Sequence, residues 1–134
     1  MTFELSVPTE ATSLGDPAAV IRCIPGVERC EPDGEGYALG AVVALGPVRL
    51  RLSGRATIQS GGGGLTADVS LHDALAGSIY GSFAVALAAG AVSVKAEVVV
   101  GGKLGEFAAP LLRRKAEEAV RGFAANLSKL AAGA

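Results

Sequence analysis

The central part of the chain alternates apolar and polar residues over several long segments, and this period of two is typical of half-buried β-strands. The clearest segment spans residues 48–59. One of its predicted faces is apolar and tapers to small residues, and the other carries three arginines: Arg49, Arg51 and Arg55. A chain patterned in this way folds most readily as an antiparallel sheet with one face buried.

The same alternation predicts further strands at residues 2–7, 27–31, 37–45, 65–71, 79–87 and 92–100. A short helix is predicted over 17–23, because Asp16 is placed to cap it and Pro17 suits the first helical position. From Leu104 to Leu130 the apolar residues recur at three and four, which predicts one long amphipathic helix with Pro110 near its start or at a kink. Four glycines at 61–64 lie between two predicted strands, so they indicate a hairpin connection and not a phosphate-binding loop, which needs a following helix.

These elements predict an α+β fold of the helix-grip type. A curved antiparallel sheet of about seven strands would wrap around the long C-terminal helix, with residues 1–134 forming one domain. Aromatic residues make up only 4% of the chain and 19 residues are glycine, so the core has few large side chains. Either the layers approach closely or the interior keeps an apolar pocket, and the sequence leaves both open.

Composition excludes several classes of function. The formal net charge is −1, which argues against binding nucleic acid. No apolar stretch is long enough to cross a membrane, and the N-terminus lacks a secretory signal, so we expect a cytoplasmic protein. Cys23 and Cys30 have neither redox-motif nor zinc-site spacing, and we expect free thiols without a metal or cofactor.

Catalysis is not expected. The lone His72 adjoins Asp73, but neighbours on a strand face opposite ways and cannot act as a base and its orienting partner. Ser70, His72 and Tyr80 are all predicted on the polar face of the sheet. The sequence shows no pairing of a nucleophile with a base.

Three segments resemble the CoxG family of carbon monoxide dehydrogenase subunits, which belongs to the START-like, SRPBCC superfamily. They are the turn Cys-Ile-Pro-Gly-Val-Glu at 23–28, the strand pair joined by Leu-Gly-Pro-Val at 45–48, and Val-Gly-Gly-Lys-Leu-Gly-Glu-Phe at 100–107 before a long helix. The resemblance implies a helix-grip fold with a hydrophobic cavity and no catalytic or metal-binding residues. It also implies an accessory role for a molybdenum-containing carbon monoxide dehydrogenase or related hydroxylase and its recruitment to the membrane, with a lipid or quinone in the cavity.

Two departures from the family pattern are present. The segment before the Cys-Ile-Pro-Gly turn is short, so the helical wall there is expected to be thin or replaced by a loop. The sequence stops at Ala134 without the extended tail of longer members, so a built-in membrane anchor is not expected.

We therefore expect a non-catalytic protein that binds a hydrophobic ligand, and the alternative is a ligand-free recruiting or assembly subunit. The inward-facing residues expected to line the ligand site are Val43, Leu50, Leu52, Val69, Phe83, Val85, Val94, Phe107, Leu111 and Phe123. The same residues could instead pack as an ordinary core.

Two surface features complete these expectations. The turn formed by Cys23, Ile24, Pro25 and Gly26 is a candidate for partner contact or for gating the cavity, although it could serve only to pack the core. A group of five arginines could bind anionic lipid at the inner face of the membrane, or it could form a solvated surface with intermittent ion pairs. Its members are Arg49, Arg51, Arg55, Arg113 and Arg114.

Overall fold

The computed structural model describes residues 1–9, 16–45, 47–61, 64–88, 90–106 and 109–133, with side chains up to residue 130. Its strands form one sheet of seven, in the order β1-β7-β6-β5-β4-β3-β2. Every neighbouring pair is antiparallel. The elements in chain order are β1 (Thr2–Pro8), α1 (Pro17–Arg22), β2 (Val27–Asp33), β3 (Gly36–Leu45), β4 (Val48–Gly61), β5 (Gly64–Asp73), β6 (Gly77–Ala88), β7 (Ala91–Gly101), the 3-10 turn η1 (Gly102–Glu106) and α2 (Ala109–Gly133).

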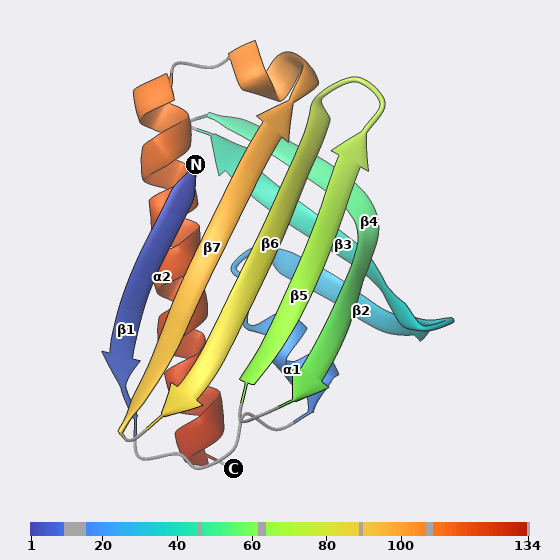
Figure 1. Ribbon diagram of the computed structural model, residues 1–134. Coiled ribbons are helices and arrows are strands. Elements are labelled where there is room, and N and C mark those ends of the chain that lie inside the picture. The colour runs from blue at the N-terminus through green and yellow to red at the C-terminus, as the bar shows by residue number, and fades with distance from the viewer. Residues whose placement is uncertain (10–15, 46, 62–63, 89, 107–108, 134) are drawn as a thin grey trace.

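The sheet curls around α2, as Figure 1 shows. Strands β2 to β7 follow one another as hairpins, and β1 joins the far edge beside β7. The N-terminus is held there because the Met1 amino group donates a hydrogen bond to Val98 O at 2.8 Å. The sequence therefore predicted the number of strands and the helix-grip arrangement, and β4 and β5 pair directly on either side of the glycine-rich connection.

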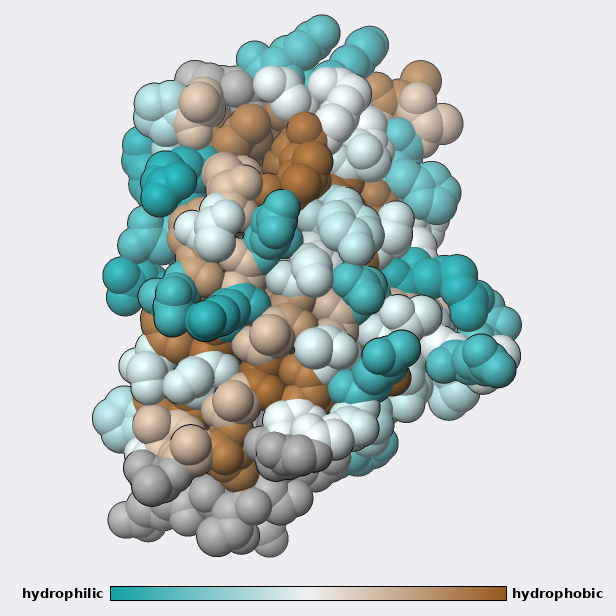
Figure 2. Space-filling view, in the orientation of Figure 1, coloured by the Kyte–Doolittle hydropathy of each residue, from teal (hydrophilic) through white to brown (hydrophobic). Residues whose placement is uncertain are grey.

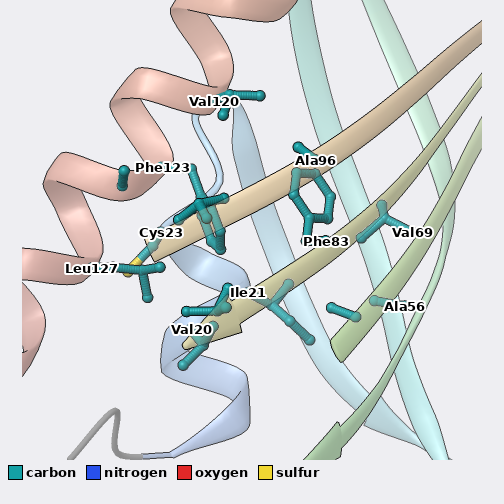
Figure 3. Packing of buried hydrophobic residues seen from close by; sticks show 14 of the residues in the cluster. Val20, Ile21, Cys23, Ala56, Val69, Phe83, Ala96, Val120, Phe123 and Leu127 are labelled. Carbon is teal, nitrogen blue, oxygen red and sulfur yellow. The ribbon is translucent and has the colours of Figure 1, made fainter. Parts of the chain in front are cut away.

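The core fills the space where α2 and α1 meet the sheet. Figure 3 shows Val120, Phe123 and Leu127 of α2 beside Val20 and Ile21 of α1, facing the strands. Helix α1 begins as predicted, with Asp16 Oδ1 accepting a hydrogen bond from the Ala18 amide. Burial of its apolar residues fixes this six-residue helix on the sheet, because so short a helix is not stable alone.

The prediction of one helix from Leu104 to Leu130 was wrong at its start. Gly102 has a φ of +67°, a left-handed conformation that follows the end of β7 at Gly101. Two residues later, Leu104 N donates a hydrogen bond to Ala76 O at 2.8 Å. This contact with the β5–β6 turn holds Leu104 inside the protein as part of η1. Helix α2 starts afresh at Ala109, and Pro110 suits its first turn because that position needs no amide donor.

Strand β2 also runs further than expected. The predicted turn at 32–34 is replaced by strand as far as Asp33, and Gly34, with a φ of +63°, provides the turn. Pro32 is tolerated within this strand because β2 lies at the edge of the sheet.

Candidate functional site

A cavity of about 810 Å³ lies between α2 and the concave face of the sheet. Helix α2 packs on β1 and β7 at one edge and touches α1, but it stands away from the middle strands. The space left between them is lined mainly by apolar residues. From the sheet and η1 these are Ala41, Val42, Val43, Ala44, Leu45, Val69, Leu71, Ile79, Gly81, Phe83, Val98, Val100 and Leu104, with Met1 from the N-terminus.

Small side chains on both walls keep the cavity open. Ala116, Ala119 and Gly122 face it from α2, and Gly81 faces it from β6. A Cβ atom on Gly81 would come within 2.9 Å of the Phe83 ring, so a larger residue at this position would clash with the ring. Short side chains on opposite walls cannot meet across the gap. The composition allowed either close-packed layers or an apolar pocket, and the structure shows the pocket.

An aromatic pair forms the deep wall. Phe83 of β6 and Phe123 of α2 are buried, with ring centroids 5.3 Å apart and planes inclined at 51°. This tilted arrangement is favourable for aromatic rings. In Figure 3 the Phe83 ring comes from the sheet and the Phe123 ring from α2, so the pair links the two layers, and both rings line the cavity.

Among the described residues, the charged groups on the cavity wall are four side chains and the Met1 amino group, which donates to Val98 O. The lining residues with ionisable side chains are Glu28, Arg49, Lys115 and Glu118; Lys115 is half-buried and the other three are exposed. The deeper lining is aliphatic or aromatic. We call these four residues the mouth of the cavity.

The Cys-Ile-Pro-Gly turn forms one side of this mouth. Ile24, Pro25 and Gly26 lie on the cavity wall, whereas Cys23 is buried in the core with its Sγ 3.3 Å from Ala19 O. The turn is fixed to α2 because Asn126 Nδ2 donates to Cys23 O at 2.9 Å.

Gly26 fixes the same turn to β3. It has a φ of +92°, and its carbonyl accepts a hydrogen bond from Val42 N at 2.8 Å. A Cβ at Gly26 would lie 2.4 Å from Val42 O, and one at Gly122 of α2 would lie 2.8 Å from Pro25 Cγ. A side chain at Gly26 would therefore push the turn away from β3, and one at Gly122 would push it away from α2.

The ten residues predicted to line a ligand site are placed differently from one another. Val43, Val69, Phe83 and Phe123 lie on the cavity wall. Leu52, Val85 and Val94 are buried elsewhere in the core, and Leu50 and Leu111 are half-buried away from the cavity wall. Phe107 lies outside the described residues.

Several lining residues were not singled out from the sequence. Ile79, Gly81, Val98 and Val100 belong to the same alternating pattern that identified the inward faces, so that signal was available. Leu112, Ala116 and Ala119 come from the apolar stripe of α2. Lys115 and Glu118 carried no signal, because charged residues on an amphipathic helix ordinarily face solvent.

The five predicted surface arginines do not form one uniform set. Arg51 pairs with Glu28 at 3.5 Å, and Arg55 pairs with Asp33. Arg113 lies over the ring of Phe3, with 5.4 Å between the guanidinium carbon and the ring centroid. Neither Arg49 nor Arg114 forms an ion pair with a residue that the structure describes.

The two thiols, His72 and Tyr80 lie away from the cavity wall. Burial raises the pKa of the Cys23 and Cys30 thiols, which favours the protonated, less nucleophilic form. His72 and Tyr80 are exposed on the outer face as predicted, and the Tyr80 hydroxyl donates to Asp68 at 2.9 Å, which raises the pKa of the tyrosine. Within the described part of the chain, no three His, Cys, Asp or Glu side chains gather as a metal site.

The surface seen in Figure 2 is mixed, with hydrophilic side chains gathered along both sides of the view and hydrophobic ones between them. None of the helices described is long and apolar enough to span a membrane.

The sequence profile of the CoxG family of carbon monoxide dehydrogenase subunits matches residues 3–132. The chain belongs to the CoxG family. The match runs from β1 to α2, and it confirms the resemblance carried by the three sequence segments. No curated protein matches the chain.

Solved structures place this CoxG-family chain among helix-grip folds. A conserved protein from Geobacillus kaustophilus superposes with a TM-score of 0.71 at 17% identity, covering 96% of this chain and 90% of that one. The Zhui aromatase/cyclase from Streptomyces sp. R1128 gives 0.59 at 12% identity, covering 99% and 92%. Ara h 8.0201 gives 0.52 at 12% identity, covering 100% and 99%. At such low identities these likenesses show the shared fold alone.

Proposed function

We propose that this protein binds an apolar ligand, a lipid or a quinone-like molecule, in the cavity between α2 and the sheet, without catalysing a reaction. The observation that carries the proposal is the cavity itself: about 810 Å³ bounded mainly by aliphatic and aromatic side chains. That volume lies within the range of about 300–1,000 Å³ common for small-molecule sites. Each buried methylene contributes about 0.8 kcal/mol, so an apolar tail alone could supply useful affinity.

The ionisable groups support binding over catalysis. The ionisable side chains near the cavity lie at its mouth, the Met1 amino group is hydrogen-bonded to Val98 O, and burial raises the pKa of both thiols, which favours their protonated form. A general acid or base must reach the reacting atoms, and the deep wall offers none among the described residues.

We further propose that the protein acts as an accessory to a carbon monoxide dehydrogenase-type enzyme and its association with the membrane. The support is membership of the CoxG family, whose name gives it as a subunit of that dehydrogenase. The exposed basic residues offer limited further support, because Arg51 and Arg55 are each balanced by an acid on β2. The Cys-Ile-Pro-Gly turn, which is hydrogen-bonded to α2 and β3, stays a candidate for partner contact or gating.

A cavity-filling variant tests the binding function. In Ala116→Phe the new ring would occupy the cavity, and we expect at least a tenfold loss of affinity for the neutral fluorescent probe Nile red, about 1.4 kcal/mol or more. Ala125→Phe is the matched control, because Ala125 is exposed on the same helix and is not on the cavity wall. Equal affinity in the wild-type protein and both variants would place the probe outside the cavity and contradict the proposal.

A further inference from the structure

We infer that Arg49 and Lys115 form a head-group site at the mouth, which selects amphiphiles whose head accepts hydrogen bonds and carries no positive charge. The tail of such a molecule would fill the apolar cavity. This inference rests on the proposed function, because it names the class of ligand that the same cavity takes.

The charge balance at the mouth supports a site for an acceptor. Glu28 is paired with Arg51 at 3.5 Å, so its charge is already matched. Arg49, Lys115 and Glu118 have no ion-pair partner among the residues that the structure describes, which leaves two cations against one anion. The chain as a whole has a formal charge of −1, so this local positive excess does not follow from the composition.

Position separates Arg49 from the other arginines of its strand. Arg51 and Arg55 reach acids on the edge strand β2. Arg49 lies near the start of β4, opposite Ala44 of β3, and both residues line the cavity. Arg49 therefore lies where the part of the cavity wall formed by the sheet ends, and it has no acidic partner among the described residues.

Lys115 brings a second cation from the opposite wall. It lies one turn before Ala119 and about one turn after Leu112, and all three line the cavity from α2. Lys115 is half-buried, as expected for a lysine whose aliphatic stem covers apolar surface.

Donor chemistry then selects the ligand. Arginine and lysine side chains only donate hydrogen bonds, so a complementary head must accept them. A carboxylate, a phosphate or a quinone carbonyl meets this requirement, and an ammonium head does not.

The test compares heads on matched tails by displacement of Nile red. Dodecanoate and dodecylammonium share a tail, and decylbenzoquinone and decylbenzene differ by the carbonyl groups. We expect wild-type protein to bind dodecanoate about tenfold more tightly than dodecylammonium, as charge-assisted hydrogen bonds allow. Arg49→Gln and Lys115→Met should each reduce that preference several-fold. Arg55→Gln and Lys129→Met, which change residues away from the cavity wall, should keep it.

The arms of the experiment separate the possible ligands and the possible failures. If Arg49→Gln and Lys115→Met reduce only the preference for dodecanoate over dodecylammonium, the site prefers an anionic head. If they reduce only the preference for decylbenzoquinone over decylbenzene, it prefers a quinone carbonyl. Equal binding of both charged ligands, unchanged in the mouth variants, overturns the head-group site and leaves the proposed function intact. Failure of wild-type protein to bind Nile red or any ligand overturns both.

Salt provides a second measurement on wild-type protein, which does not depend on the variants folding. Dodecanoate affinity should fall several-fold between low and high salt, while decylbenzene affinity should not fall. A dodecanoate affinity that is independent of salt would contradict the inference.

Discussion

The two ends of the interface between α2 and the sheet are filled differently. At one end, the packed flank, Val92 and Val94 of β7 and Ala124 and Leu127 of α2 are each 0% exposed. At the other end, the cavity side, Val98 of the same strand and Ala119 of the same helix are half-buried and line the cavity. Both regions are built from small and medium aliphatic residues, so residue type alone does not decide which region packs and which stays open.

The difference lies along the strands and the helix. The register pairs Val94 of β7 with Val85 of β6 at the packed flank and Val98 with Gly81 at the cavity side, so the same strands contribute to both regions. Rigidity is therefore expected at the packed flank and tolerance of substitution at the cavity side. The variants below probe this contrast, from the largest expected effect to the smallest.

Truncating a leucine in each region should give the largest contrast. Leu127→Ala removes a fully buried side chain and should lower the free energy of unfolding by about 2–5 kcal/mol. Leu112→Ala, on the same helix but half-buried at the cavity, should cost less than about 1.5 kcal/mol because it opens no new closed void. Urea unfolding measures both, and equal losses would show that the cavity side is packed.

Replacing alanine with phenylalanine tests the same contrast by adding side-chain volume instead of removing it. Ala124→Phe forces a ring into the packed flank and should destabilise the protein by about 1–3 kcal/mol. Ala116→Phe has the cavity to enter and should change stability by less than about 1 kcal/mol. Thermal unfolding compares the two, and a destabilised Ala116→Phe matching Ala124→Phe would contradict an open cavity.

A methyl group at the turn should act on ligand exchange more than on stability. In Gly122→Ala the new Cβ would lie 2.8 Å from Pro25 Cγ and push the Cys-Ile-Pro-Gly turn away from α2. The gain in helix propensity, about 1 kcal/mol, should offset this strain. We expect a several-fold faster dissociation of Nile red in stopped-flow measurements, and an unchanged rate would show that the turn does not gate the cavity.

The cysteines should give the smallest effect. Because burial raises the pKa of both thiols in the folded state, their contribution to stability is present at neutral pH and is lost as pH rises through the folded-state pKa. The free energy of unfolding should therefore fall more steeply above the ordinary thiol range in wild-type protein than in a Cys23→Ala, Cys30→Ala variant. Identical slopes would contradict the assignment, and slow alkylation by iodoacetamide at neutral pH, accelerated in urea, is an independent check.

Alternation of apolar and polar residues was sufficient to predict the strands and the inward face of the sheet. It could not predict which inward residues border a cavity, because that depends on the distance to α2. Val94 and Val69 both face inward, yet Val94 is buried at the packed flank and Val69 lies on the cavity wall. The start of α2 was missed for a related reason: η1 is fixed by a tertiary hydrogen bond from Leu104 to Ala76, which no local pattern records.

Position along a strand also limits what alternation can predict. Arg49, Arg51 and Arg55 share one predicted face, but Arg49 lies near the β3–β4 turn, where the sheet wall ends, and so borders the mouth. Its separate environment became visible only once the register and the acidic partners of the other two arginines were known.

The central claim is that the cavity holds an apolar-tailed molecule, and native mass spectrometry of protein isolated gently from its own cells tests it most directly. The account predicts a stoichiometric adduct in wild-type protein and in Ala125→Phe that is absent from Ala116→Phe, with organic extraction releasing a lipid or quinone-like molecule. A clean ligand-free mass for the wild-type protein, with a Nile red affinity that Ala116→Phe leaves unchanged, would contradict it.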